Sequence, residues 1–193
     1  GLLTFSGNYT KDGSGSDLTS SGAATISFGG AVTNTRGTGF NLSNSTTIFT
    51  GSGNVTPTTA MTFGNVTINN GITRTTVSAA GTLTISGNLL LSGTGTLAGT
   101  EAILLTGAST TIDGTGTLSA ASTVSAAHSI LSTANLTISG TMTLSGANGD
   151  VNNSGTVTAA TINGDNAGAT WTQSTSTSVL NISTALLATN GAL

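Results

Sequence analysis

The sequence predicts an all-β fold, a β-solenoid built from short strands, and three observations support this prediction. Strong helix formers such as Lys, Glu and Met are scarce, while β-branched residues and Gly interrupt every window of the chain. Apolar and Thr residues alternate over short stretches that Gly or Asn soon follows. Several segments recur at intervals of roughly 20 residues, which suits one coil of a solenoid.

The strands are expected to be very short, because the alternation lasts only a few residues before a turn signal. Each alternating triplet places two apolar side chains on one face and Thr on the other, since successive side chains of a strand point to opposite faces. Gly and Asn tolerate positive φ and therefore predict tight turns after the triplets. The triplets are Val66-Thr67-Ile68, Leu83-Thr84-Ile85, Leu136-Thr137-Ile138 and Met142-Thr143-Leu144.

Internal repeats indicate that the strands belong to stacked coils. Residues 93–97 recur as residues 114–118, and residues 83–87 recur identically as residues 136–140. The steps between other Gly-Thr-apolar segments vary, so either the corner loops differ in length or some steps count faces instead of whole coils. The alternative fold is a β-sandwich of short hairpins, completed by a donated strand.

Two segments also resemble the repeats of known surface proteins. Residues 61–71, followed by residues 81–87, resemble the repeats of large secreted bacterial β-solenoid surface proteins. Residues 140–148 are similar to the autotransporter-associated β-strand repeat of passenger domains. The resemblance implies a right-handed parallel β-helix displayed outside the cell, as an adhesin or a fibre.

Composition divides the chain near residue 60. All five Phe and the single Tyr lie between Phe5 and Phe63, and no basic residue follows Arg74. We therefore predict that residues 1–59 form an aromatic-containing N-terminal cap or strand-donating region. Residues 60–193 are predicted to hold the solenoid repeats and a C-terminal end segment.

The sequence offers little for catalysis or for metal and cofactor binding. Charged residues make up 5% of the chain, Cys is absent, and a formal net charge of −3 argues against a nucleic-acid partner. His128, the only histidine, has no carboxylate near it in the sequence and is expected at a corner. We predict no enzyme activity and no catalytic, metal or cofactor-binding residue. No apolar stretch approaches the roughly 18 residues of a membrane helix, so no membrane span is expected.

So few charges favour a protein that works in an assembled state, because a charge-poor surface gives poor colloidal stability. We predict a structural subunit of an extracellular filament or surface layer, a homopolymer whose partners are copies of itself. Assembly is expected through β-edges or strand donation, with Leu3, Phe5 and Tyr9 as the apolar side chains of the donated strand.

Two other functions fit the same composition. One is an adhesin or carbohydrate-binding segment of a larger surface protein, whose partners are glycans or the surface of a host or neighbouring cell. The other is an ice-binding solenoid, because Thr-apolar-Thr triplets such as Thr82-Leu83-Thr84 and Thr156-Val157-Thr158 point both threonines outward.

The sequence also contains N-glycosylation sequons, and a coat of sugar would keep so uncharged a surface in solution. The candidate acceptors are Asn8, Asn41, Asn44, Asn54, Asn65, Asn135, Asn152 and Asn181.

Overall fold

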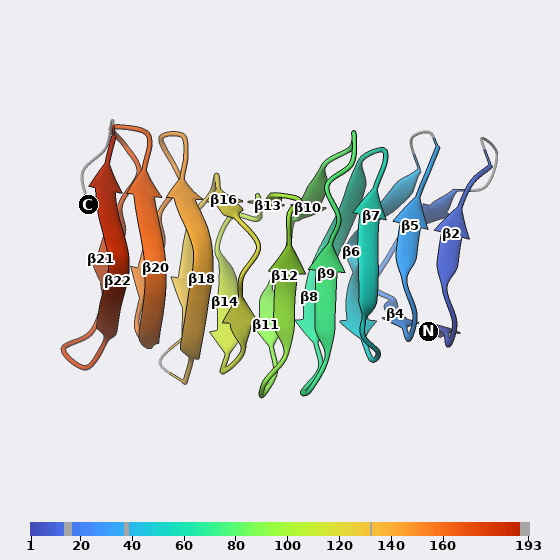
Figure 1. Ribbon diagram of the computed structural model, residues 1–193, viewed down its shortest axis with the longest axis horizontal. Helices are drawn as coiled ribbons and strands as arrows, with labels where there is room; N and C mark the ends of the chain where they lie inside the picture. Colours follow the sequence, from blue (N-terminus) through green and yellow to red (C-terminus); the bar gives the residue numbers. More distant parts are fainter. Residues whose placement is uncertain (14–16, 37–38, 132, 190–193) are drawn as a thin grey trace.

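The chain winds into a parallel β-solenoid of about nine turns, as the sequence predicts. The structure is a computed structural model that describes residues 1–13, 17–36, 39–131 and 133–189. Figure 1 shows the coils stacked along one axis, from the N-terminus on the right to the C-terminus on the left. Within the described residues there is no helix, and hence none that is long and apolar enough to cross a membrane.

Each coil contributes one strand, or one half of a longer strand, to each of three faces. Face A holds β1 (Leu2–Phe5), β4 (Thr25–Phe28), the second halves of β6 (Phe40–Phe49) and β8 (Met61–Ile68), β11 (Leu89–Leu91), β14 (Thr110–Gly114), β17 (His128–Ile130), β19 (Val151–Asn153) and β21 (Trp171–Gln173). Face B holds β2 (Tyr9–Lys11), β5 (Val32–Asn34), β7 (Gly53–Pro57), β9 (Thr73–Thr76), β12 (Thr96–Gly99), β15 (Thr117–Leu118) and the first halves of β18 (Asn135–Leu144), β20 (Thr156–Gly164) and β22 (Val179–Ala188). Face C holds β3 (Leu18–Thr19), the first halves of β6 and β8, β10 (Leu83–Ile85), β13 (Ile103–Leu105), β16 (Ser122–Val124) and the second halves of β18, β20 and β22.

The strand pairing decides between the two predicted folds. Every pairing between the described strands is parallel, whereas a sandwich of hairpins needs antiparallel neighbours. The alternative prediction of a β-sandwich completed by a donated strand is therefore wrong. Coils also vary in length: Leu89 pairs with Ile112 and Ile112 pairs with Ile130, so the second of these coils is shorter than the first.

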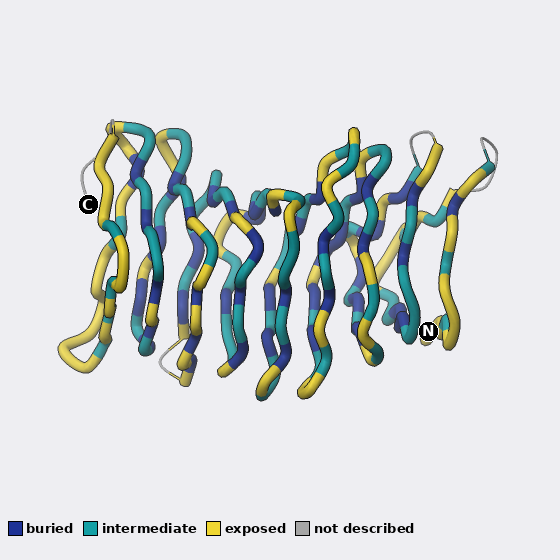
Figure 2. The backbone as a smooth tube through the Cα atoms, in the orientation of Figure 1, coloured by how far each residue is buried: buried dark blue, intermediate teal, exposed yellow. Residues whose placement is uncertain are grey.

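The core lies inside the coils and follows from the alternation in the sequence. In β10, for example, Leu83 and Ile85 are buried while Thr84 is half-buried on the outside. Figure 2 shows the same alternation of buried and more exposed residues along coil after coil. Because the same inward positions are apolar in neighbouring coils, stacking buries a continuous column that no single coil buries alone.

The two repeats occupy different kinds of position in the coils. Thr96 and Leu97 pair with Thr117 and Leu118, so residues 93–97 and 114–118 are equivalent parts of neighbouring coils. The identical segments 83–87 and 136–140 lie on face C and face B, respectively. The uneven steps in the sequence therefore have both predicted causes, since coil length varies and some steps count faces.

The described part of residues 1–59 is wound in the same way as the later coils. An aromatic stack fills their interior: the rings of Phe5 and Phe28 are stacked with centroids 5.1 Å apart, and those of Phe28 and Phe49 lie 5.9 Å apart. The rings of Phe49 and Phe63 meet edge to face, with centroids 5.8 Å apart. The coils extend back to β1, so a cap in this region would itself be built of coils.

Gly64 shows how a strand turns the corner between faces C and A. Residues 61–63 of β8 pair on face C, and residues 65–68 pair on face A. A Cβ atom at Gly64 would lie 2.5 Å from the carbonyl oxygens of Ser43 and Ser45 in the previous coil. Only Gly therefore lets the backbones of two coils approach this closely at the corner.

Candidate functional site: the open edges of the first and last coils

The first coil has strands that pair on one side only among the described residues. Its strands β1, β2 and β3 pair with β4, β5 and the first half of β6, which form the second coil. Leu2 and Leu3 are 70% and 46% exposed, so apolar side chains accompany the free backbone edge. An unpaired strand edge is a template for further β pairing.

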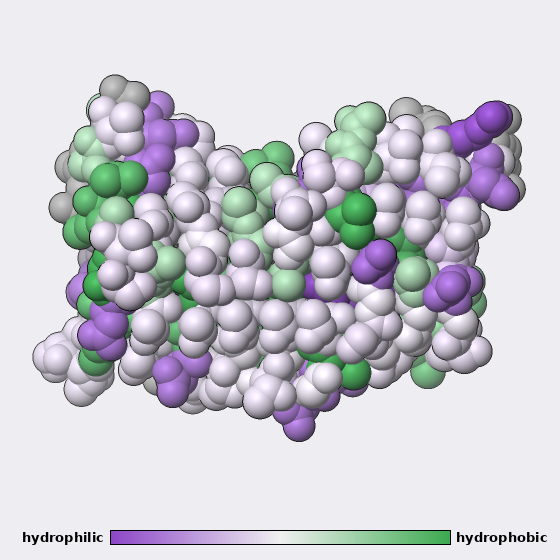
Figure 3. Space-filling view, in the orientation of Figure 1, coloured by the Kyte–Doolittle hydropathy of each residue, from purple (hydrophilic) through white to green (hydrophobic). Residues whose placement is uncertain are grey.

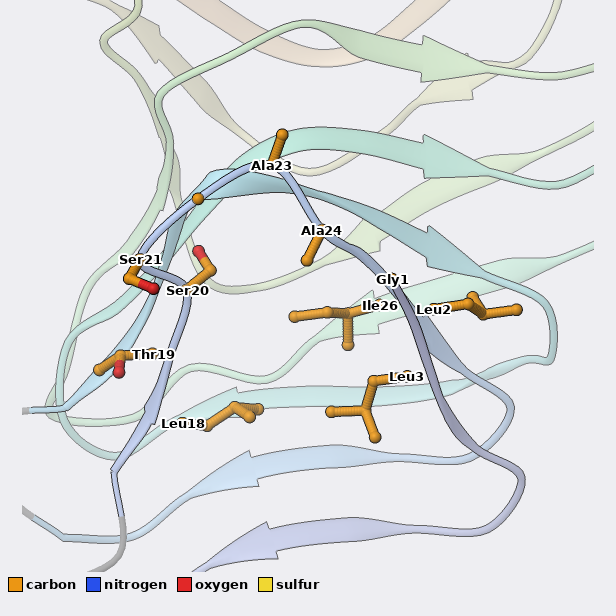
Figure 4. Close-up of a pocket in the computed structure, with 11 residues that line it drawn as sticks. Gly1, Leu2, Leu3, Leu18, Thr19, Ser20, Ser21, Ala23, Ala24 and Ile26 are labelled. Carbon is orange, nitrogen blue, oxygen red and sulfur yellow. The ribbon is translucent and has the colours of Figure 1, made fainter.

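A pocket opens beside this edge. It has a volume of about 450 Å³ and lies between β1, β3 and the start of β4. Figure 4 shows the side chains of Leu3, Leu18 and Ile26 converging on one space. The pocket is an apolar recess at the place where the interior of the solenoid meets the solvent.

The last coil has a matching free edge. Strand β21 pairs with β19, and β22 pairs with β20, and neither has a second partner among the described strands. Val179, Leu186 and Leu187 are 39%, 52% and 46% exposed. Figure 3 shows hydrophobic side chains gathered at the left, over this coil, with smaller hydrophobic spots elsewhere on the same face. Residues 166–189 include no charged residue.

The predicted assembly residues Leu3, Phe5 and Tyr9 all lie in the first coil. Leu3 and Phe5 pair with Ile26 and Phe28, and the ring of Tyr9 lies 4.8 Å from that of Phe5. Burial raises the pKa of the Tyr9 phenol. The segment that the sequence offers for donation therefore forms the edge coil of its own chain.

The eight predicted glycosylation acceptors are all exposed. The reason is the strand period, because in Asn-X-Thr on a strand the middle residue faces inward and Asn faces outward, as at Asn54, Val55 and Thr56. Some of these Asn side chains also form hydrogen bonds between coils: the Asn65 Oδ1 accepts a hydrogen bond from the backbone N–H of Asn88 at 2.9 Å. Their modification stays a prediction.

An outward column of threonines runs along face B. It was not recognisable in the sequence, because only the strand pairing shows which threonines are neighbours. The Thr-apolar-Thr triplets are spread over different faces, and Thr158 is their only member in this column, while Thr137 comes from the alternating triplet Leu136-Thr137-Ile138. Five consecutive coils contribute to it: Thr73, Thr96, Thr117, Thr137 and Thr158.

The structure also buries three ionisable side chains whose burial was not predicted from the sequence. Lys11 is 2% exposed, and its Nζ donates to the carbonyl of Arg36 at 2.7 Å and lies 3.9 Å from Asp17 Oδ1. Arg74 is fully buried in the fourth coil, and its guanidinium donates to the carbonyls of Phe28 and Gly30 in the second coil. Each charge is stabilised by backbone oxygen atoms instead of by surface solvent.

His128 is the third, and its predicted corner position is wrong. It lies in β17 with its side chain inward, 1% exposed, because it occupies the inward position that Val151 takes in the next coil. Its Nδ1 lies 2.8 Å from the carbonyl of Ala126, so Nδ1 carries the proton. Nε2 is buried with no hydrogen-bond partner among the described residues. Burial lowers the pKa of His128, and the hydrogen bond to Ala126 opposes that shift.

The described residues bring together no cluster of three or more His, Cys, Asp or Glu side chains. Asp150 illustrates what the acids do: its Oδ1 accepts hydrogen bonds from the N–H and hydroxyl of Thr170, in the next coil. Such contacts join successive corners of the solenoid.

Fold and edges together define the class of protein, a parallel β-solenoid with apolar, unpaired strands on the first and last coils of its described part. Comparison with protein-family models, curated proteins and solved structures gives no match to this chain.

Proposed function

We propose that the chain is a non-catalytic structural subunit of an extracellular filament or surface layer, which assembles through its free β-edges. The observation that carries the proposal is that the first and last coils both combine strands unpaired among the described residues with exposed apolar side chains. Pairing these edges satisfies backbone hydrogen bonds and removes apolar surface from water in one step.

The rest of the surface supports this proposal. Charged residues make up 5% of the chain, so little electrostatic repulsion opposes the approach of two copies. Exposed sequons and the resemblance to secreted surface proteins favour a location outside the cell.

Negative-stain microscopy of the purified chain tests the proposal. Filaments or sheets are expected at concentrations where Leu187→Lys, which places a charge on the last coil, gives only monomers. Thr123→Lys is the matched control, because on face C Thr123, Thr143, Asn163 and Leu187 are successive pairing partners, so Thr123 faces outward like Leu187 but lies in the middle of the solenoid. A monodisperse wild-type monomer that binds glycans would overturn the proposal in favour of an adhesin.

A second candidate function rests on the threonine column of face B. Five outward threonines lie in neighbouring coils, at the spacing of about 4.8 Å between paired strands. A regular array of hydroxyl and methyl groups without charge suits binding to an ordered lattice of water. Thermal hysteresis in a freezing assay is the activity that this function requires.

A further inference from the structure

We infer that two copies join head to tail, with the last coil of one copy stacked on the first coil of the next. In this arrangement β21 pairs with β1, the first half of β22 with β2, and the second half of β22 with β3. The inference rests on the proposed function, which it deepens by naming the partner, the two surfaces and their register.

The columns of face C give the register. Thr19 pairs with Asn41, and the same outward column passes through every coil to Asn163, which pairs with Leu187. Thr19 and Leu187 are thus the two ends of one column. Stacking two copies in register places Leu187 directly over Thr19 of the next copy.

The neighbouring inward column brings the two apolar surfaces together. Ile162 is buried and pairs with Leu186, which is 52% exposed at the end of the column. At the other end Leu18 pairs with Phe40 and lines the pocket of the first coil. In-register stacking puts Leu186 against Leu18, so the exposed leucine of one copy closes the apolar pocket of the next.

Strand direction selects the head-to-tail arrangement over a symmetric one. A translation along the solenoid axis keeps all strands parallel and sets each face on its own kind. A two-fold axis across the joint would make the strands of the two copies antiparallel. It would also place face B of one copy against face C of the other wherever face A met face A. Only the translation continues the three sheets together, and because it is a heterologous contact that does not close, it generates an open filament.

Electrostatics do not oppose this joint. Residues 166–189 of the last coil carry no charge, and the buried charge of the first coil, Lys11, already has oxygen partners within its own chain. Stacking two copies therefore buries none of these residues as a charged side chain without a partner. The Asp17 carboxylate, 58% exposed, is at the surface.

Two measurements test the inference. The first is disulfide cross-linking with the single variants Thr19→Cys and Leu187→Cys, which is clean because the sequence has no Cys. Directly opposed residues on neighbouring strands lie about 4.8 Å apart at Cα, within the range that a disulfide spans. We expect oxidised dimers when the two variants are mixed and none from either variant alone. Thr19→Cys mixed with Thr143→Cys, two coils inward from Leu187, is the control that should not cross-link.

The second measurement is the axial repeat of the wild-type filament. Nine coils at about 4.8 Å predict a subunit repeat of about 43 Å along the filament. Filaments with another repeat, or filaments in which Thr19→Cys and Leu187→Cys do not cross-link, overturn the inference and leave the filament function standing. Dimers of Leu187→Cys alone would show a tail-to-tail joint and also overturn it. If the wild-type chain forms no assembly, the inference and the proposed function fail together.

Discussion

The guanidinium carbon of Arg74 lies 4.4 Å from the centroid of the Phe49 ring, inside the solenoid. Arg74 belongs to the fourth coil and Phe49 to the third, while the carbonyls that accept its hydrogen bonds belong to the second. The side chain thus ties three coils together along the axis. Burial lowers the pKa of Arg74 to about 10, so the group is still charged at neutral pH.

Truncating Arg74 tests the value of these contacts. We expect Arg74→Ala to lower the free energy of unfolding by about 3–5 kcal/mol, because it leaves a cavity and removes the hydrogen bonds to the carbonyls of Phe28 and Gly30. Arg74→Met keeps an apolar chain over Phe49 and removes the buried charge, so a smaller loss of about 1–3 kcal/mol is expected. Urea unfolding measures both, and equal losses for the two variants would contradict a packing role for the side chain.

Gly53 leaves room for the Arg74 side chain, because it has no side chain of its own. Its φ is +157°, and a Cβ atom there would lie 3.1 Å from the backbone nitrogen of Ala31 and 3.3 Å from Nη1 of Arg74. We expect Gly53→Ala to destabilise the protein by about 1–2 kcal/mol through backbone strain and this crowding. In the Arg74→Met background the part of the loss that comes from contact with Nη1 should disappear, which a double-mutant cycle detects. Strictly additive losses would show that Gly53 serves the backbone alone.

His128 makes stability depend on pH. The unfolded chain binds a proton near pH 6.5, whereas burial keeps the folded pKa lower, so below pH 6.5 the unfolded state holds more protons. Stability is therefore complete above about pH 6.5 and falls on acidification, by at most about 1.4 kcal/mol for each pH unit. Unfolding curves between pH 7.5 and 5.0 measure the slope.

The matched control for this slope is His128→Val, because Val151 fills the same inward position in the next coil. We expect the variant to show a flat profile between pH 7.5 and 5.0, since the chain has no other histidine. A slope unchanged by the substitution would assign the pH dependence to other groups.

Phe28 is the centre of the aromatic stack, fully buried between Phe5 and Phe49. We expect Phe28→Ala to cost about 3–5 kcal/mol of folding free energy, because the cavity lies between two rings that cannot both move in. Phe28→Leu keeps most of the volume and should cost about 1–1.5 kcal/mol. Thermal melting followed by circular dichroism orders the variants, and an Ala variant as stable as the Leu variant would contradict a rigid stack.

The threonine column of face B gives the ice-binding candidate its own test. Thr137 is the exposed fourth member of the column, so Thr137→Lys should abolish any thermal hysteresis of the wild type. Thr123→Lys, on face C, should retain it. If the wild type shows no hysteresis, the column serves only as a polar cover for the sheet.

Much of the fold was predictable because the strand period is local. The triplets around Thr84 and Thr143 alternate within three residues, and both place their apolar side chains inward as expected. The residues that occupy equivalent positions in neighbouring coils were predictable only where the coil keeps a constant length, as from Thr96 to Thr117. Identical segments such as 83–87 and 136–140 lie on different faces because their separation in the chain is not a whole number of coils.

The sequence by itself determined the β-solenoid, the direction of each alternating side chain, the aromatic character of the first coils and the exposure of the sequons. These features depend on the two-residue period of a strand and on Gly at corners, which are properties of neighbouring residues. Only the tertiary structure decided that Lys11, Arg74 and His128 are inside, and that Thr19 and Leu187 end the same column. Those facts depend on which coils stack and in which register, and contacts between residues one coil apart in the chain fix that register.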